Sequence, residues 1–228
     1  MLKIEKTVLP SHEQWEIIIE GMRNPMNSWD KMDSDTCSNK YCDCDKDDFC
    51  EYGYCIGEND HKLMMQLAKG GPVHAKYRRM IPVFLTINAP LYWWKEFDTY
   101  KVGTVANSCS TMHKIHSKPF AMDDFSLEHL EDIFLDGLRE VCVLLNTARN
   151  MYLCARIEKE PLVPAKDYWW QMIQLLPTSY NQKRTVMLNY EVLVNIYHSR
   201  KNHKLDEWHV FCDWIRQLPY SELITGGE

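Results

Sequence analysis

The chain has 228 residues, of which 45% are hydrophobic and 25% charged, and its formal net charge is −6. This length and composition are typical of one sizeable globular domain. The negative balance disfavours a protein that coats nucleic-acid polymers, although a local cationic pocket for a phosphate stays compatible with it. No apolar run is long enough to span a bilayer, and the N-terminus has no signal-peptide core. We therefore expect a cytoplasmic protein without a membrane span.

Nine cysteines occur in the chain, and five of them fall between Cys37 and Cys55 with the spacing C-x4-C-x-C-x5-C-x4-C. They lie in an acidic stretch without periodicity, which predicts an insertion at about residues 33–60. The spacing differs from the paired C-x2-C of strong zinc motifs, yet neighbouring thiols in a reducing compartment favour a metal. A zinc site and a surface insertion with free thiols both stay open. The zinc hypothesis takes as ligands Cys37, Cys42, Cys44, Cys50 and Cys55.

The other cysteines, Cys109, Cys142, Cys154 and Cys212, stand mostly in apolar helical contexts, which predicts buried and inert thiols. Cys109 lies between two serines, and it could be either a nucleophile or a thiol that only packs against its neighbours. No base is identifiable beside it in the sequence, so packing is favoured.

The N-terminal half predicts alternating strands and helices. Lys3–Val8 alternates apolar and polar residues and is expected to form a strand. A helix should start at Ser11, which can form a capping box with Gln14. A second helix is expected over Asp60–Lys69, and Arg79–Asn88 is typical of a buried strand.

An aromatic and polar stretch follows from Ala89 to His116. Pro90 cannot stand in a helix interior, so a short helix is expected over Leu91–Phe97. Tyr100–Thr104 should be extended or looped, with Gly103 giving the backbone freedom. Asn107–Thr111 has the composition of a loop that binds something through hydrogen bonds. The alternative is an aromatic core segment followed by a polar turn.

The C-terminal half is predicted to be mostly helical. Apolar residues recur at helical spacing over Ser126–Glu158, with Ser126 as the cap, and helices are also expected over Lys166–Leu176, Thr185–Arg200 and Leu205–Leu218. These elements predict a single α/β (α+β) domain over residues 1–228.

A basic cluster ends the helix predicted before residue 201. Asn195 lies beside the apolar stripe of that helix and needs a hydrogen-bond partner. Arg200, Lys201, His203 and Lys204 follow at the end where the helix dipole favours cations. One interpretation is a solvated basic helix end. The other is an anion site in which Arg200 is a bidentate donor.

Several of these segments, taken in order, resemble the flavin-dependent thymidylate synthases, the ThyX family. Gly70-Gly71-Pro72-Val73-His74 precedes a strand that ends in Ala89-Pro90, and an aromatic helix and the loop Asn107–His113 follow. Leu176-Pro177 then precedes Asn189, Asn195 and Arg200 at intervals that match the family pattern N-x-R-x-x-x-N-x-x-x-x-R. The resemblance covers most of the chain outside the cysteine-rich insertion.

The resemblance implies a ThyX-like single domain with a central mixed or antiparallel sheet flanked by long helices, assembled as a homotetramer. It also implies that the protein methylates dUMP to dTMP, with methylenetetrahydrofolate as carbon donor, FAD as cofactor and NADPH as reductant. The family needs no protein nucleophile. The implied cofactor-binding residues are His74, Lys101, Asn107, Asn189 and Asn195. The implied substrate-binding residues are Ser108, Ser110 and Arg200, of which Ser110 and Arg200 are also the catalytic candidates.

The sequence departs from the family where the family has cations. The R-H-R triplet is replaced by Tyr100-Lys101-Val102, or by Thr99-Tyr100-Lys101 if one residue is inserted before Asn107. Four further positions differ, namely Ser108, Met112, Ile173 and Glu191. Each lost charge-assisted bond costs about 1.5–3 kcal/mol. Two other hypotheses therefore accompany the first. One is a diverged nucleotide- or flavin-binding protein without thymidylate synthase activity, and the other is a metal-stabilised interaction protein.

Overall fold

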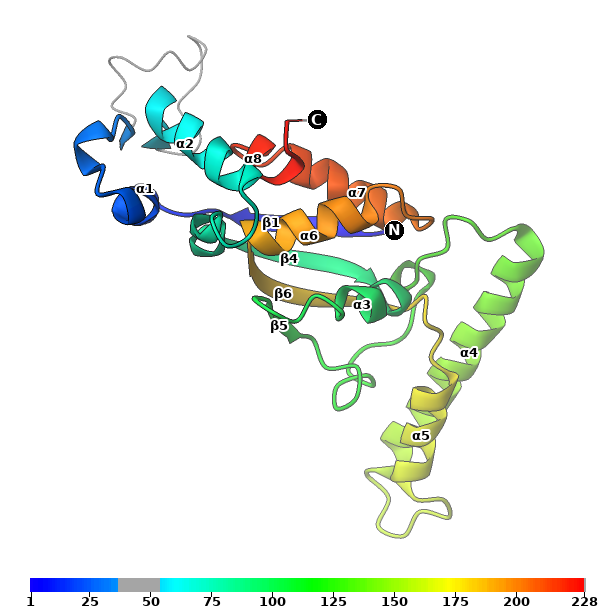
Figure 1. Ribbon diagram of the computed structural model, residues 1–228. Helices are drawn as coiled ribbons and strands as arrows, with labels where there is room; N and C mark the ends of the chain where they lie inside the picture. The colour runs from blue at the N-terminus through cyan, green and yellow to red at the C-terminus, as the bar shows by residue number, and fades with distance from the viewer. Residues whose placement is uncertain (37–53, 228) are drawn as a thin grey trace. The chain divides into compact units, whose positions relative to one another are not determined.

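The structure is a computed structural model that describes residues 1–36 and 54–227. It has a mixed α/β fold with a four-stranded sheet in the order β1-β4-β6-β5 and a two-stranded sheet, β2-β3 (Figure 1). The strands are β1 (Lys3–Val8), β2 (Asp35–Thr36), β3 (Tyr54–Cys55), β4 (Pro82–Pro90), β5 (Val105–Ser108) and β6 (Asn181–Asn189). The predicted α/β fold class is confirmed.

Eight α-helices are present in the described part of the chain. They are α1 (His12–Arg23), α2 (Glu58–Lys69), α3 (Leu91–Phe97), α4 (Asp132–Ala155), α5 (Ala165–Leu175), α6 (Tyr190–Arg200), α7 (Asp206–Arg216) and α8 (Glu222–Thr225). Short 3-10 helices are η1 (Asn24–Met26), η2 (Trp29–Lys31), η3 (Lys76–Met80) and η4 (Met122–Asp124). No described helix is both long and apolar enough to cross a membrane.

The chain divides into two compact units, each assembled from several segments. The hairpin unit comprises residues 1–3, 87–99 and 107–184, and the main unit comprises the described residues of 4–86, 100–106 and 185–228. The long strands β4 and β6 each run from one unit into the other. The prediction of a single domain stays a prediction.

Three local predictions are confirmed in detail. The strand over Lys3–Val8 and the helix over Leu91–Phe97 have the expected bounds. The capping box at α1 is also present, because the Ser11 hydroxyl accepts the Gln14 backbone N–H while the Gln14 side chain accepts the Ser11 N–H at 2.9 Å. Local capping chemistry was sufficient to place this helix.

The helix predicted over Thr185–Arg200 is wrong in its first part. Residues up to Asn189 belong to strand β6, where Gln182, Val186 and Leu188 are buried and the residues between them are more exposed. That period of two marks a strand, and the helix begins only at Tyr190. Similarly, β4 begins at Pro82 because the preceding residues form η3.

Ser126 does not cap the long helix. Helix α4 begins at Asp132 with Glu131 as its N-cap. The Ser126 hydroxyl instead donates to the Asn181 side chain at 2.9 Å, and its backbone N–H donates to the Ser179 carbonyl at 2.8 Å. Ser126 therefore links the segment that precedes α4 to the start of β6 within the hairpin unit.

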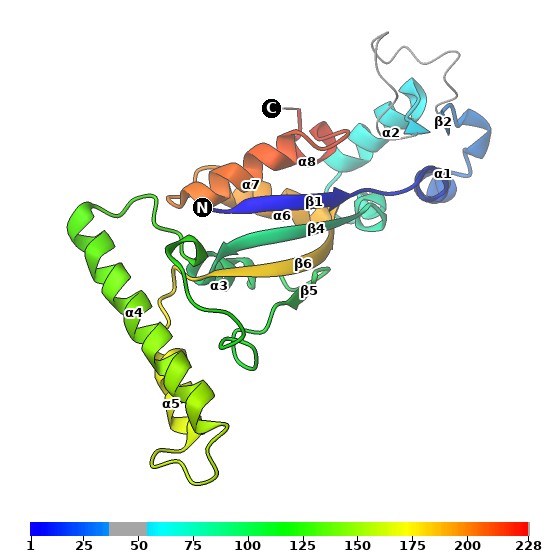
Figure 2. The same cartoon turned by 180° about the vertical axis from the view of Figure 1, so that it is seen from behind.

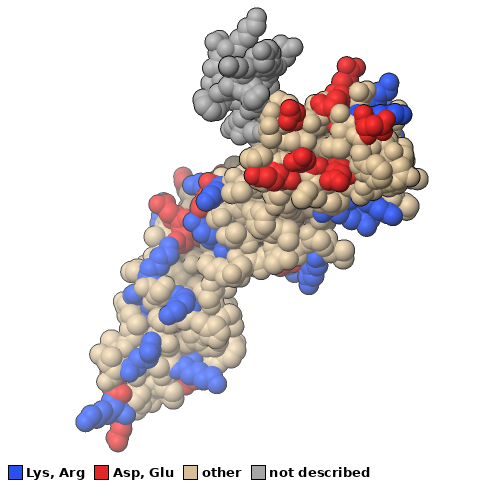
Figure 3. Space-filling model, turned by 90° about the vertical axis from the view of Figure 1, so that its left-hand side faces the viewer, with Lys and Arg blue, Asp and Glu red and all other residues tan. Residues whose placement is uncertain are grey.

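Helix α5 packs side by side with the second half of the longer helix α4, as both ribbon views show (Figure 2). Their shared core contains Leu138, Leu145 and Met172, which are at most 8% exposed. The opposite face of α4 carries Ile133, Leu144 and Met151, which are 74%, 54% and 47% exposed. On the face drawn in Figure 3, the lower part of the view, which contains this hairpin, shows Lys and Arg side chains separated by uncharged surface.

The two described ends of the predicted insertion pair with each other. Asp35 lies opposite Cys55 and Thr36 opposite Tyr54 in the antiparallel β2-β3 sheet. Tyr54 and Asp60 are buried, so these ends pack into the main unit. Residues 37–53 lie outside the described residues, and the extent of the insertion stays a prediction.

Candidate functional site

The predicted site residues belong to both units. Those of the main unit are His74, Lys101, Asn189, Asn195 and Arg200, and those of the hairpin unit are Asn107, Ser108 and Ser110. Within the main unit, helix α6 brings Asn189 to its start and Arg200 to its end. Asn195 and Lys101 are exposed.

Asn189 is fixed by the strand-to-helix turn. It is the last residue of β6 and the N-cap of α6, and its side-chain oxygen accepts the Val192 backbone N–H at 3.1 Å. Capping of this kind is preferred by Asn because the side chain satisfies a helix donor that has no partner in the helix. The cap uses the side-chain oxygen of Asn189, so the amide nitrogen of the same side chain takes no part in this hydrogen bond.

The loop before β5 lies against this cap. Gly103 has φ +81°, and a side chain there would meet Val192 Cγ2 at 3.1 Å and Asn189 Nδ2 at 3.2 Å. Glycine therefore meets two requirements at once, the left-handed backbone and the close approach to α6. The prediction that Gly103 provides backbone freedom is confirmed.

Arg200 is held by two aromatic residues. Its Nε donates to the Tyr100 hydroxyl at 2.8 Å, and its guanidinium lies 4.8 Å from the Trp208 ring centre and 5.5 Å from that of Tyr100. The two rings meet edge to face at 6.1 Å. A guanidinium stacked in this way keeps its fork pre-organised. Trp208 was not predicted as a site residue, although aromatic residues near a helix-end arginine are a recognisable signal.

His74 lies on the wall of an apolar cavity of the main unit with a volume of about 430 Å³. Methionines provide much of the wall, and Tyr77 also lines it while its hydroxyl donates to the Met64 carbonyl at 2.8 Å. The lining residues are Gly21, Met22, Pro25, Met26, Leu67, Val73, His74, Lys76, Tyr77 and Met80. A soft apolar wall with few polar groups is typical of a small-molecule site.

The polar loop of the hairpin unit is exposed. Asn107 and Ser108 end strand β5, and both are open to solvent. The Ser110 hydroxyl accepts the His113 backbone N–H at 2.9 Å, which leaves its own proton to donate. Cys109 is exposed, as is Cys154, so the prediction of buried thiols is wrong for these two and confirmed for Cys142 and Cys212. Burial raises the pKa of the Cys212 thiol to about 11.

A network around Trp94 anchors that loop, and sequence inspection did not identify it. Trp94 is buried and donates to the Gln182 carbonyl at 2.8 Å, and the Gln182 amide donates to the Cys109 carbonyl at 2.9 Å. The Arg184 guanidinium lies 4.3 Å from the Trp94 ring centre and pairs with Asp98 at 2.8 Å. The buried, alternate positions of β6 were the signal that could have revealed Gln182.

A buried ion pair is the second feature that sequence inspection missed. Glu191, which stands where the ThyX pattern has an arginine, lies 3.6 Å from Arg78 of η3, and both residues are 8% exposed. Arg78 Nε and Glu191 Oε2 have no hydrogen-bond partner in the described part of the chain. The pair is therefore held by charge more than by hydrogen bonds.

Of the five proposed zinc ligands, one belongs to the described residues. Among the residues that the structure describes, no group of three or more His, Cys, Asp or Glu side chains is placed to hold a metal ion. Cys55 is half-buried in β3, and the other four proposed ligands lie outside the described residues. Zinc binding stays a prediction.

Comparisons with known proteins place the fold. The chain is similar to the crystal structure of thymidylate synthase X (ThyX) from Helicobacter pylori with FAD and dUMP, with a TM-score of 0.58 and 14% identity over 99% of this chain and 97% of that chain. A second structure of flavin-dependent thymidylate synthase ThyX from Helicobacter pylori, complexed with FAD and dUMP, has a TM-score of 0.54 and 13% identity over 97% and 95%. No protein-family model and no curated protein sequence matches the chain. At this identity the likeness shows a ThyX-like fold.

Proposed function

We propose that the protein is a flavin-dependent thymidylate synthase-like enzyme that methylates dUMP to dTMP in the cytoplasm. Methylenetetrahydrofolate would donate the carbon, with FAD as cofactor and NADPH as reductant. The observation that carries the proposal is the fold likeness over 99% of the chain to a protein that holds FAD and dUMP. The order of Asn189, Asn195 and Arg200 along helix α6 supports it.

The cavity beside His74 suits the ring system of a flavin. Its methionine and leucine side chains provide apolar contact for a planar ring, while His74 and Lys76 offer polar groups for its edge or for a phosphate. When bound, the flavin would supply the electrons that turn the transferred carbon into a methyl group. In this proposal Asn107, Asn189, Asn195 and Lys101 also contact the cofactor.

Arg200 would bind the pyrimidine nucleotide, with Ser108 and Ser110 near its phosphate. The Arg200 fork is already oriented by Tyr100 and Trp208, so little side-chain entropy is lost when an anion binds. Ser110 has its hydroxyl proton available for a phosphate oxygen. Each of these groups would stabilise negative charge on the part of the substrate that it contacts.

The purified protein tests the proposal directly. We expect a yellow protein that retains FAD, and release of tritium from C5-labelled dUMP in the complete reaction. Arg200→Ala should weaken dUMP binding by about tenfold or more, because a charge-assisted bond is lost. Ser199→Ala, an exposed position of the same helix, should leave it unchanged. Colourless protein that cannot be reconstituted with FAD would exclude the proposal.

A second candidate is a diverged flavin- or nucleotide-binding protein without synthase activity. The specific observation in its favour is that Glu191, a carboxylate, stands at a family arginine position. Glu191 forms an ion pair with Arg78, so the charge of Arg78 is already balanced and does not replace the missing arginine. Protein that binds FAD and dUMP but releases no tritium would favour this candidate over the first.

We further propose that the protein assembles into a homo-oligomer, with four subunits as the resemblance implies. Ile133, Gly137, Leu144 and Met151 lie one above the other on α4, and the three apolar side chains are exposed. A contiguous apolar stripe on a two-helix hairpin is typical of a protein interface. We expect Leu144→Glu to lower the mass measured by light scattering, and Arg139→Gln, an exposed position of α4 outside this stripe, to leave it unchanged. An unaltered mass for Leu144→Glu would place any interface elsewhere.

Zinc at the cysteine-rich stretch is kept as a separate hypothesis for a metal-stabilised interaction protein. Metal analysis of the wild type against a Cys42→Ser/Cys44→Ser variant tests it. Equal zinc content in the two proteins would remove this hypothesis.

A further inference from the structure

A second cavity of the main unit lies between the end of α1, the 3-10 helix η2 and the start of α2. Its volume is about 680 Å³, and polar side chains dominate its wall. The lining residues are Arg23, Met26, Ser28, Asp30, Lys31, Asn59, Lys62, Leu63 and Gln66. Met26 also lines the cavity beside His74, and the other lining residues differ.

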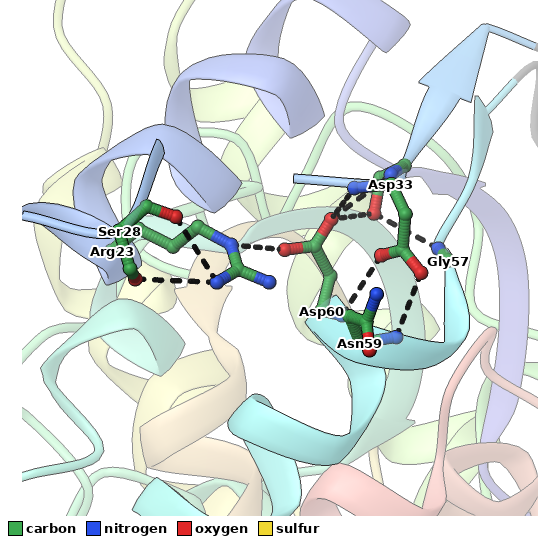
Figure 4. Close-up of polar contacts among 7 residues, drawn as sticks. Arg23, Ser28, Asp33, Gly57, Asn59 and Asp60 are labelled. Carbon is green, nitrogen blue, oxygen red and sulfur yellow. Dashed lines mark hydrogen bonds and ion pairs between the residues drawn. The ribbon is translucent and has the colours of Figure 1, made fainter. Parts of the chain in front are cut away.

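Arg23 is the buried charged group of this cavity, with 3% of its surface exposed. Its Nε donates to Asp60 Oδ1 at 2.5 Å, and its Nη1 donates to the Ser28 carbonyl and hydroxyl at 3.3 and 3.2 Å (Figure 4). Its Nη2 is buried and has no hydrogen-bond partner among the described residues. A buried donor without a partner is costly, so a ligand acceptor at this atom would remove the cost.

Asp60 accepts hydrogen bonds at both carboxylate oxygens, but none of them comes from Arg23 Nη2. Its Oδ2 accepts from the backbone N–H groups of Asp33 and Ser34 and from the Ser34 hydroxyl, at 3.0, 2.9 and 2.6 Å. Burial opposes ionisation of Asp60, but these hydrogen bonds and Arg23 together hold its pKa below the ordinary value. Asp60 is therefore a fixed anion that positions Arg23 through its Nε (Figure 4).

Asp33 completes this support from the other side. Its carboxylate accepts the backbone N–H groups of Asn59 and Asp60 at 2.8 and 3.0 Å, which caps helix α2. A side chain at Gly57 would lie 2.3 Å from Asp33, so glycine is required for this approach. The wall that carries Asn59, Lys62 and Gln66 is thus held rigidly relative to Arg23 within the same unit.

The charges of the cavity favour an anion. Among the lining residues, Arg23, Lys31 and Lys62 carry three positive charges against one negative charge on Asp30. Asp60 and Asp33, which do not line the cavity, add two negative charges next to Arg23 and the start of α2. Ser28, Asn59 and Gln66 add hydrogen-bonding groups that suit hydroxyls. Asp30 can accept from a hydroxyl but repels an anion, which sets an orientation for a ligand with both kinds of group.

We propose that this cavity binds a small phosphorylated polyol, such as a sugar phosphate, with the phosphate against Arg23 and Lys62. A phosphate has several acceptor oxygens and can therefore bind donors from separate side chains. A phosphate alone would fill only a small part of the cavity volume. The remaining space is where hydroxyl groups meet Asn59, Gln66 and Asp30. This site is independent of the proposed flavin and dUMP function.

The test uses the full chain, with ribose 5-phosphate and inorganic phosphate as probes in calorimetric titrations. We expect saturable binding of ribose 5-phosphate, tighter than that of phosphate. Lys62→Gln should weaken it about fivefold or more, since one charge-assisted bond is lost. Lys69→Gln, at the far end of the same helix and outside the cavity, should have no effect. Circular dichroism shows whether each variant folds.

Three results would overturn the proposal. They are no saturable binding of either probe, equal affinities for Lys62→Gln and the wild type, and equal binding of ribose 5-phosphate and unphosphorylated ribose. Arg23→Lys adds an independent check, because lysine keeps the charge but lacks the free Nη2 donor. If Arg23→Lys folds, its affinity should also fall. The FAD content should stay the same in Lys62→Gln, so failure of this proposal is distinguishable from failure of the proposed enzyme function.

Discussion

Helices α6 and α4 differ in how much of each is covered by its own unit. More than half of the 11 residues of α6 are buried, namely Tyr190, Glu191, Val192, Leu193, Ile196 and Tyr197. In the 24 residues of α4 the buried ones form one stripe, Leu138, Cys142, Leu145, Ala148 and Ala155. Packing within its own unit therefore fixes a larger share of α6 than of α4, where only one face is fixed in this way.

The largest expected effect comes from the buried ion pair of α6. We expect Glu191→Gln to reduce the free energy of unfolding by about 3 kcal/mol, because Arg78 would then lack its counter-charge in a buried place. Urea denaturation followed by circular dichroism measures this. The matched change on α4, Glu140→Gln, removes an exposed charge and should alter stability by less than about 0.5 kcal/mol. Equal effects at the two positions would show that the contrast between the helices does not extend to charge.

A smaller effect is expected at the glycine that approaches α6. Gly103→Ala should cost about 1–2 kcal/mol, since the residue has φ +81° and its new Cβ would press on Val192 and Asn189. The measurement is the midpoint of urea denaturation. If the proposed cofactor role of Asn189 is right, FAD retention should fall as well. Unchanged stability would mean that this loop shifts freely, and that α6 is less constrained than its burial suggests.

How much could be predicted from sequence depended on how local the determining interaction is. The Ser11–Gln14 capping box and the Leu91–Phe97 helix depend on neighbours in the chain, and both were predicted correctly. The end of β6, from Thr185 to Asn189, was predicted as helix because Val186 and Leu188 fit both periods when they are joined to the true helix that follows. Only pairing with distant strands decides between them.

The candidate site shows the same division. Gly103 was identified from residue type because turn chemistry is local, whereas Asn189 was named by the family resemblance and its N-cap role was not foreseen. The partners Arg78 of Glu191 and Trp208 of Arg200 could not be foreseen, since each meets its partner across the fold. Asp60 was expected to begin a helix, yet its burial against Arg23 required the tertiary structure. Long-range charge partners are what sequence patterns leave out.

The smallest expected effect is a stabilisation on α4, and it has the opposite sign from the change at Gly103. Gly137 lies in the helix interior, and a side chain there would meet no atom within 4 Å in the described structure. Gly137→Ala should therefore raise the free energy of unfolding by about 0.5–1 kcal/mol, because alanine reduces the entropy lost when the helix forms. Urea denaturation at several protein concentrations separates this gain from oligomerisation. A loss of stability that grows at high concentration would instead show that Gly137 lies in a subunit interface, where α4 is as covered as α6.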